Sequence, residues 1–261
     1  MAAIKHNRVI SLVLAAGQGK RMENKDLPKV LALLDGKPLI RYVLDAVRMS
    51  GVSERTAIVV GFQAEKVMAE LGSGCDYVLQ AERRGTGHAV MCAEAALKEK
   101  AEHVLVLYGD MPLVTADTVQ RLVAAHHASD SMLTMATMRV EDFNDWRQGF
   151  ASFGRVLRSS RGDVEASVEA KDATPEQLKN TECNPCLYCF NAAWLWDNIK
   201  LLKDANAQGE YYLTDLIAAA KGQGHAIATI EIDPRDAFGI NTPHDLAVAN
   251  QLQREQQVVF A

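Results

Sequence analysis

The sequence Gly17-Gln-Gly-Lys-Arg21 combines two glycines and two cations directly after an apolar run. Flexible glycines, and the small residues before them, let a ligand approach the backbone closely, and the backbone N–H groups of such a turn can surround an anion. Arg21 can bind two phosphate oxygens at once, and Lys29 adds another cation after the rigid Pro28. Because cations beside a glycine turn suit a triphosphate better than a monophosphate, the sequence predicts a triphosphate site.

Two common phosphate-binding loops do not fit these residues. The Rossmann dinucleotide loop needs a third glycine where this chain has Met22. The P-loop needs a serine or threonine after its lysine, but Arg21 follows Lys20 and supplies no hydroxyl for magnesium. An ordinary loop with solvated charges is the alternative that these residues alone leave open.

A carboxylate stands at the end of another apolar run. Asp110 follows the sequence HVLVLYG of residues 103–109, which predicts a buried strand. Sites in α/β proteins form at the carboxyl ends of such strands, and carboxylate oxygens are ligands that Mg²⁺ prefers. A turn or helix-capping role is the alternative for a lone aspartate in this place.

Composition and charge exclude several classes of function. The 261 residues are 48% hydrophobic and 23% charged, which is ample for a packed core. With a net charge of −5, an isoelectric point of about 5.8 and no basic block, the chain is not expected to bind nucleic acid or a membrane surface. No apolar run approaches the ~18 residues of a membrane span, and we interpret the first run as a strand rather than a signal peptide. Five cysteines, an odd number, favour free thiols in a reducing cytoplasm.

Short β-rich runs alternate with amphipathic stretches through the first half of the chain, which predicts βαβ units, a parallel sheet and an α/β fold. We expect strands at residues 8–14, 56–60, 75–79, 103–108, 131–140, 152–158, 187–191 and 226–232. We expect helices at residues 38–50, 63–71, 88–98, 115–128, 192–202, 212–221 and 243–258, with Thr115 and Thr242 as N-caps. The polar residues 159–182 are expected to form a lid or excursion.

Seven segments together resemble the sugar nucleotidyltransferase family. They are LAAGQGKRM with LPKVL at residues 14–22 and 27–31, QAERRGTGHAV at 80–90, VLVLYGDMPLV at 104–114, FGRV at 153–156, VEAKDAT at 168–174, NAQGEYYLTDLI at 206–217 and GINTPHDL at 239–246. In this order they look like the N-terminal uridylyltransferase domain of the bacterial bifunctional enzymes that make UDP-N-acetylglucosamine. The resemblance implies a Rossmann-like, mostly parallel twisted sheet flanked by helices, with a smaller sugar-binding lobe that contains β-strands.

The activity that this resemblance implies is attack of a sugar 1-phosphate on UTP, with release of pyrophosphate. The implied substrates are UTP and N-acetylglucosamine 1-phosphate, the implied cofactor is Mg²⁺, and the implied role is cytoplasmic supply of an amino sugar for the cell wall. Arg21 would neutralise the leaving phosphates, and Lys29 would lie near the reacting phosphorus. Asp110 and Asn241 would hold the metal.

The resemblance also implies which residues bind the base, the ribose and the sugar. Gln80 is expected to read uracil, because an amide carries both the donor and the acceptor that the imide edge requires. The implied nucleotide-binding residues are Leu14, Ala15, Ala16, Gly17, Gln80, Gly85, Thr86, Tyr108 and Gly109. The implied sugar-binding residues are Gly154, Glu169, Asn184, Tyr212 and Thr214.

These sets divide the chain. Residues 1–241 are expected to form the nucleotidyltransferase domain, with a nucleotide-binding half at about 1–130 and a sugar-binding half at about 131–241. Residues 242–261 would form a C-terminal helix and tail. The sequence contains no hexapeptide repeats of the kind that build a left-handed β-helix, so acetyl transfer is not expected, and the oligomeric state stays open.

The chain departs from the family pattern beside the expected sugar. Asn184-Pro185-Cys186 stands where the family usually has Asn-Thr-Gly, which leaves the identity of the sugar open. The same departure creates the spacing Cys183-x2-Cys186-x2-Cys189, which superficially suggests a zinc or iron–sulfur site. If this stretch is extended, the outer two thiols face one side and the middle thiol faces the other, so the three are not expected to converge.

Histidines give no stronger signal for a metal. His88 is expected in a loop or cap, with at most an indirect contact to the nucleotide, and His126 and His127 are expected at a helix end. Three alternatives to the implied activity remain at this point. They are transfer to another sugar 1-phosphate, a cytidylyltransferase, and a non-catalytic sensor of nucleotide sugars.

Overall fold

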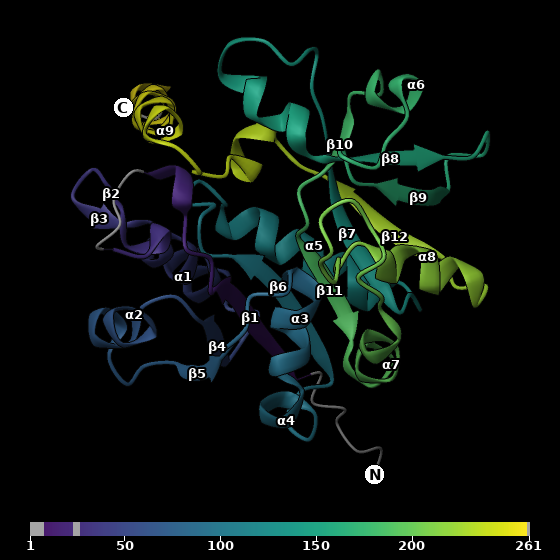
Figure 1. Cartoon of the computed structure of the whole chain (residues 1–261), viewed down its shortest axis with the longest axis horizontal. Helices are drawn as coiled ribbons and strands as arrows, with labels where there is room; N and C mark the ends of the chain where they lie inside the picture. The colour runs from purple at the N-terminus through teal and green to yellow at the C-terminus, as the bar shows by residue number, and fades with distance from the viewer. Residues whose placement is uncertain (1–7, 23–26, 260–261) are drawn as a thin grey trace.

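The computed structural model describes residues 8–22 and 27–259, in which ten strands form one sheet. The strands of the first half are β1 (Val9–Ala15), β4 (Arg55–Val60), β5 (Asp76–Leu79) and β6 (His103–Tyr108). Those of the second half are β7 (Leu133–Arg139), β8 (Gly154–Arg158), β9 (Val164–Val168), β10 (Glu182–Asn184), β11 (Tyr188–Asn191) and β12 (Ile227–Glu231). The strand order is β5-β4-β1-β6-β11-β7-β10-β8-β9, with β12 paired to β7, so the two halves occupy adjoining parts of the sheet (Figure 1).

Strand direction differs between the two halves. β1 lies parallel between β4 and β6, and β5 extends this parallel set beyond β4. β12 is parallel to β7, whereas β11 is antiparallel to both β6 and β7. β10, β8 and β9 then follow as antiparallel strands. The predicted α/β fold with a mostly parallel sheet is confirmed, and every antiparallel pair described in this sheet includes a strand of the second half.

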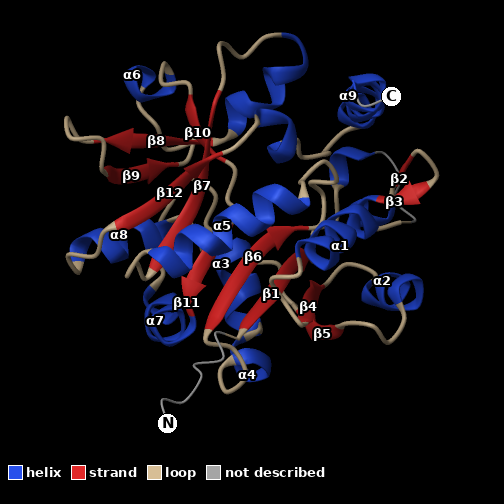
Figure 2. Cartoon of the chain, turned by 180° about the vertical axis from the view of Figure 1, so that it is seen from behind, coloured by secondary structure: helices blue, strands red, loops and turns tan. Residues whose placement is uncertain are grey.

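Helices cover both faces of the sheet (Figures 1 and 2). They are α1 (Leu39–Ser50), α2 (Ala64–Leu71), α3 (Thr86–Cys92), α4 (Glu94–Leu97), α5 (Ala116–Ala128), α6 (Pro175–Leu178), α7 (Ala192–Asn198), α8 (Asp215–Gly222) and α9 (Pro243–Val259). β1 is buried along its whole length, and its neighbouring residues Leu12 and Val13 pack in opposite core clusters. Two apolar layers therefore form, because alternate side chains of a strand face opposite sides of the sheet.

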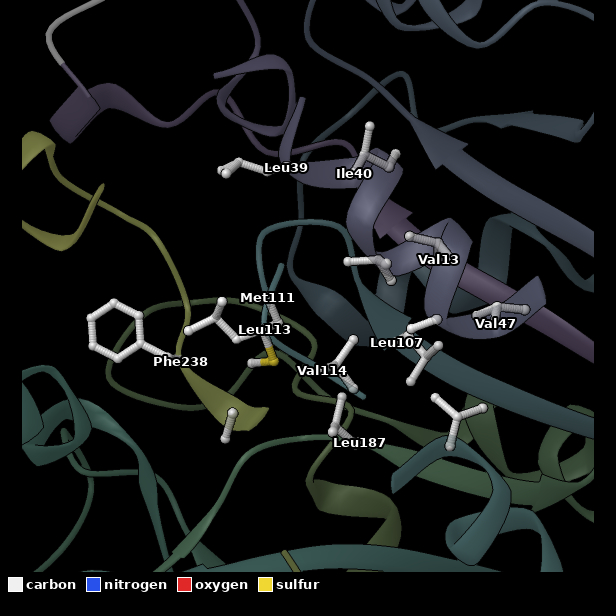
Figure 3. Packing of buried hydrophobic residues seen from close by; sticks show 14 of the residues in the cluster. Val13, Leu39, Ile40, Val47, Leu107, Met111, Leu113, Val114, Leu187 and Phe238 are labelled. Carbon is white, nitrogen blue, oxygen red and sulfur yellow. The ribbon is translucent and has the colours of Figure 1, made fainter. Parts of the chain in front are cut away.

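One of these layers fixes the loop that carries Asp110. Val13 of β1, Leu107 of β6 and Val47 of α1 belong to one apolar cluster, and Leu113 and Val114 continue it just beyond the strand (Figure 3). Burial of each such side chain contributes roughly 1.5–3 kcal/mol to folding. The loop after β6, which carries Asp110, is thus held in place by the packing of its own apolar residues Leu113 and Val114.

The predicted N-caps are confirmed. The Thr115 hydroxyl accepts a hydrogen bond from the Thr118 N–H at 3.2 Å at the start of α5. At the start of α9, the Thr242 hydroxyl accepts from the Asp245 N–H at 3.1 Å, and the Asp245 carboxylate accepts from the Thr242 N–H at 2.9 Å. Each side-chain oxygen satisfies a backbone donor that the first helical turn leaves unpaired.

Three expectations about local structure were wrong. The helix expected at residues 88–98 begins earlier, at Thr86, and divides at Ala93 into α3 and α4. The expected helix at 212–221 starts only at Asp215. Residues 159–182, expected as a lid or excursion, contain strand β9, which pairs with β8, and helix α6; the alternating sequence VEASV of β9 was a strand signal that the sequence analysis missed.

The cysteines do not form a cluster. Cys183 and Cys189 pack in the same core cluster, and Cys186 contacts the opposite one, as the sequence predicted. The stretch is not continuously extended, however, because Cys186 adopts a left-handed φ of 63° between β10 and β11. Across residues 8–22 and 27–259, no group of three or more histidine, cysteine or acidic side chains is arranged to hold a metal. In the same residues, no helix combines the length and the apolar character needed to cross a membrane.

Candidate active site

A cavity of about 600 Å³ opens where three parallel strands end. Gly17 follows β1, Gln80 follows β5 and Asp110 follows β6, so these residues meet at one edge of the sheet, where α/β sites form. The volume of the cavity lies in the range of roughly 300–1,000 Å³ that is typical of small-molecule sites. Of the predicted residues, the cavity is lined by Leu14, Ala15, Ala16, Gly17, Lys29, Gln80, Gly85, Thr86, Tyr108 and Asp110.

Lys29 joins three distant parts of the chain. Its ammonium group forms an ion pair with the Asp110 carboxylate and donates to Asn241 Oδ1 at 2.8 Å. The backbone N–H of Ile240 donates to the Asp110 carbonyl at 2.9 Å, which holds Asn241 beside the aspartate. The side chains of Lys29 and Asp110 are only 13% and 16% exposed, so water screens this pair less than a surface pair.

The oxygens around Lys29 fit a cation site. A carboxylate from Asp110 and an amide oxygen from Asn241 converge on one positive charge, the Lys29 ammonium. Hard divalent cations such as Mg²⁺ take the same kind of oxygen donors and keep several waters. The donor set that the sequence predicted for a metal is therefore brought together at the edge of the cavity.

Gly19 allows the glycine loop to pass over Lys29. Its φ is +67°, and a Cβ built on it would lie 2.5 Å from the Lys29 Cβ, so no larger residue fits there. The loop then closes in a 3-10 turn at Lys20–Met22, with the Met22 N–H bonded to the Gly19 carbonyl at 2.8 Å. Lys20 lines the cavity, whereas Arg21 is exposed on this turn and is outside the set of described residues that line it. Lys29 thus lines the cavity, and Arg21, expected at the leaving phosphates, lies on the exposed turn beside it.

The Gln80 side chain is almost fully buried at 4% exposure and is held by α3 and its lead-in. Gln80 Nε2 donates to the Gly85 carbonyl at 3.1 Å and lies 3.1 Å from His88 Nδ1. Gly85 has a φ of +103°, and a Cβ on it would meet the Tyr211 carbonyl at 2.6 Å. The histidine expected in a loop or cap thus lies within α3, in contact with the predicted base reader.

The predicted sugar residues lie beside the cavity rather than on its lining. Asn184 is 1% exposed, and its Nδ2 donates to Ser167 Oγ at 2.9 Å and to Tyr188 Oη at 2.7 Å. Its Oδ1 accepts from the Cys186 N–H at 2.8 Å. Gly154 pairs with Asn184 across β8 and β10. The Asn184 amide is therefore engaged within the protein on both of its ends.

Glu169 lies close to this network, near the Cys186 thiol. The Thr214 hydroxyl donates to Glu169 Oε1 at 2.8 Å, and burial raises the pKa of this carboxyl. Burial, and then the charge of Glu169, raises the pKa of the Cys186 thiol. Burial also raises the pKa of Tyr108, which lines the cavity together with Thr86. The charge of Glu169 raises the pKa of Tyr108 further, so Tyr108 lies between the cavity and the residues expected to bind the sugar. Tyr212 is buried at 8% exposure, and Gly109 donates to the Leu14 carbonyl at 3.0 Å behind the cavity wall.

Two charged lining residues escaped the sequence analysis, Arg83 and Glu210. Arg83 stands two residues before Gly85 within an already recognised segment, so its position was a signal that could have found it. Glu210 reaches the cavity because the neighbouring Tyr211 pairs with the lead-in to α3: its N–H donates to the Arg84 carbonyl at 2.8 Å. That pairing joins segments more than a hundred residues apart and has no signal in the sequence.

A cavity at the ends of parallel strands, crossed by a glycine loop, defines the class as an α/β domain with its ligand site at the carboxyl ends of the strands. Solved structures share the fold. A Bacillus anthracis protein assigned as a glucose-1-phosphate thymidylyltransferase, in complex with sucrose, matches with a TM-score of 0.73 at 20% identity, over 94% of this chain and 95% of its own. A CMP:2-keto-3-deoxy-manno-octonic acid synthetase complexed with CTP matches with a TM-score of 0.66 at 14% identity, over 95% of this chain and 99% of its own.

The chain belongs to the family of MobA-like NTP transferase domains, whose model matches residues 11–223. Among its relatives are the bifunctional proteins GlmU of Clostridium beijerinckii and Pelotomaculum thermopropionicum, each 39% identical over 247 residues, or 94% of this chain. The match covers 52% of each of them, so the chain spans about half the length of the curated relatives it matches. The resemblance to nucleotidyltransferases noted in the sequence is confirmed.

Proposed function

We propose that the protein is a Mg²⁺-dependent uridylyltransferase that makes UDP-N-acetylglucosamine from UTP and N-acetylglucosamine 1-phosphate. The observation that carries this proposal is the junction of Lys29, Asp110 and Asn241 at the edge of a nucleotide-sized cavity. The 39% identity to proteins named GlmU supports the choice of substrates. The product would serve cytoplasmic supply of an amino sugar for the cell wall.

In the proposed reaction, a phosphate oxygen of the sugar 1-phosphate attacks the α-phosphorus of UTP. One P–O bond forms, the bond between the α-phosphorus and the bridging oxygen breaks, and pyrophosphate leaves with the electron pair. Such a reaction depends on positioning and charge neutralisation more than on covalent chemistry of the protein. Lys29 and Lys20 supply positive charge beside the phosphates, with Arg21 on the same turn.

Asp110 and Asn241 would hold Mg²⁺, which neutralises charge on the phosphates when it is bound. The backbone of the glycine loop at Leu14–Gly17 would hold the ribose and phosphates, and Gln80 with Gly85 and Thr86 would hold the base. Glu169 would accept hydrogen bonds from sugar hydroxyls. Residues to about 130 would thus bind the nucleotide, and those from about 131 to 241 the sugar.

A second candidate is transfer of UMP to a different sugar 1-phosphate. The observation that favours it is Cys186, whose thiol occupies the neighbourhood of Glu169 and Tyr108 where the family pattern has a glycine. The reaction and the metal site would be the same in both cases.

The test is pyrophosphate release with Mg²⁺ for a grid of substrates. UTP, CTP, dTTP, ATP and GTP are each combined with N-acetylglucosamine, glucosamine, glucose and galactose 1-phosphates. Release only with UTP and N-acetylglucosamine 1-phosphate is the expected result. Stronger release with UTP and another sugar selects the second candidate, and no release from any pair, in a protein that still binds UTP, contradicts both in favour of a nucleotide-sugar sensor.

A further inference from the structure

The Gln80 amide is held in one orientation by two acceptors. A carbonyl oxygen can only accept, so the contact with Gly85 requires the amide nitrogen, rather than the amide oxygen, to face it at 3.1 Å. The same nitrogen lies 3.1 Å from His88 Nδ1. Both N–H groups of the amide are then engaged, so the expectation that Gln80 offers a donor as well as an acceptor to the base was wrong. Gln80 Oε1 has no hydrogen-bond partner among the residues that the structure describes, in a side chain that lines the cavity.

We propose that His88 is a positioning residue for base selection: its Nδ1 fixes the Gln80 amide so that only an acceptor oxygen is presented to the base. This inference rests on the proposed function, in which Gln80 reads uracil. Uracil carries an N–H at position 3, which an acceptor satisfies, whereas cytosine carries a bare ring nitrogen there. A fixed amide oxygen therefore favours uracil and leaves two acceptors facing each other with cytosine.

The His88 ring is itself held by its surroundings. Cys92, one turn further along α3, places its sulfur 4.0 Å from both ring nitrogens, and the ring centroid of Tyr211 lies 6.4 Å away. The Tyr211 carbonyl accepts from the Gly87 N–H at 2.8 Å and fixes the first turn of α3. Since Nδ1 must accept from Gln80, the neutral ring carries its proton on Nε2.

The Gly85 carbonyl alone would not fix the amide. One hydrogen bond leaves the Gln80 side chain free to pivot about the N–H···O line, and the oxygen then moves relative to the base. The second bond, to His88, removes this freedom because it points in a different direction from the same nitrogen. Loss of the His88 acceptor should therefore weaken selection between bases more than it weakens binding of the triphosphate.

Three variants test this assignment. His88→Leu removes the acceptor and replaces the ring with an apolar side chain of similar bulk. His88→Asn can place its Oδ1 near the position of Nδ1. Cys92→Ala is the matched control, because it removes the sulfur contacts of the ring and leaves the Nδ1 acceptor in place. The measurement is the ratio of kcat/KM with UTP to kcat/KM with CTP.

We expect His88→Leu to lower the UTP:CTP ratio by about tenfold, as the loss of one orienting hydrogen bond implies. His88→Asn and Cys92→Ala should keep the ratio within about threefold of the unaltered protein. An unchanged ratio in His88→Leu overturns the proposal. A fall in His88→Asn as large as in His88→Leu also overturns it, because the ring would then matter for its shape alone.

A measurement on the free protein separates this proposal from the proposed function. The side-chain amide resonances of Gln80, identified by their absence in Gln80→Ala, report the hydrogen bonds without substrate. We expect two well-separated amide protons that are retained in His88→Asn and that converge in His88→Leu. If the unaltered protein does not use UTP, the proposed function fails, while these resonances still decide the His88 contact; if His88→Leu does not fold, the resonances of the unaltered protein and of His88→Asn decide it.

Discussion

The proposed nucleotide side and the proposed sugar side of the site are built in opposite ways. On the nucleotide side, loops that follow parallel strands open a cavity of about 600 Å³ and line it with backbone and with the cations Lys20, Lys29 and Arg83. On the sugar side, antiparallel strands carry side chains such as Asn184, which is 1% exposed and hydrogen-bonded within the protein. The groups of the first side face the cavity, whereas side chains of the second side such as Asn184 are hydrogen-bonded within the protein.

This difference predicts which substitutions each half tolerates. Backbone groups of the nucleotide side depend on the strand ends and on glycines such as Gly19, which has no room for a side chain. The sugar side depends on a network of side chains in which one substitution alters several contacts at once. We therefore expect substitutions on the sugar side to change the preference among sugar 1-phosphates while the transfer reaction itself is kept.

The largest effect is expected for Asp110, the proposed metal ligand on the nucleotide side. Asp110→Ala removes the carboxylate that pairs with Lys29, and turnover should fall by about 1,000-fold or more, while UTP binding weakens by less than about tenfold. Pyrophosphate release and calorimetric titration of UTP measure the two quantities. Asp45→Ala is the control. It breaks the partly exposed ion pair between Asp45 of α1 and Lys37, and it should leave turnover and UTP binding unchanged. Turnover that survives in Asp110→Ala would show that the metal assignment is wrong.

The next effect is a loss of stability at low pH, and it concerns a histidine where the two halves meet at the opposite end of the sheet. His126 of α5 lies 3.0 Å from His103 of β6 and 2.8 Å from the Thr134 hydroxyl of β7. Burial, and then the charges of His103 and His127, lower the pKa of His126 to about 4. The unfolded chain therefore binds more protons between pH 6.5 and pH 4, so stability is fully present above this window and is lost as the pH falls through it.

The expected loss is about 3 kcal/mol of unfolding free energy, and urea unfolding between pH 7 and pH 4 measures it. Comparison of His126→Asn with the unaltered protein isolates this residue from the carboxylates that also titrate there. The exposed His127 gives the control, since His127→Asn should retain most of the pH dependence. Equal pH dependence in His126→Asn and the unaltered protein would remove His126 from this role.

A smaller effect is expected where the base is read. Gln80→Ala removes the proposed uracil reader, and the preference for UTP over CTP should fall by about tenfold because one hydrogen-bonding group is lost. Competition between the two nucleotides in one reaction mixture measures it directly. If UTP is preferred as strongly as before, Gln80 has no part in base recognition.

The smallest effect is expected on the sugar side. Cys186→Gly restores the family's glycine at a φ of 63°, which relieves about 1 kcal/mol of backbone strain and loses a similar amount of buried surface. Stability should therefore change by less than about 1 kcal/mol, while the relative rates with different sugar 1-phosphates shift by about fivefold. Cys75→Ala, at a half-buried thiol far from Cys186, is the control. Unchanged relative rates would show that the departure from the family pattern does not set the sugar.

Much of the nucleotide side could be predicted because its signals are local. A continuous apolar run such as that of β6 can only be a buried strand or a buried helix, and its short length decides for a strand. The residue that follows such a strand lies at the site edge of the sheet, which placed Asp110 correctly. β9 was missed because its short alternating sequence, VEASV, lies within a polar and charged stretch, and His88 was misplaced because α3 starts on the unusual backbone of Gly85.

By itself, the sequence determined the alternation of strands and helices, the glycine loop and the chemical types of the site residues, because these follow from the spacing of apolar side chains and from short motifs. Only the tertiary structure decided which of these residues meet. Lys29 bonds to Asn241 across 212 positions, and Gln80 lies against His88 because α3 begins where Tyr211 holds it. Contacts between distant segments depend on how the sheet orders its strands, and no local pattern of side chains carries that information.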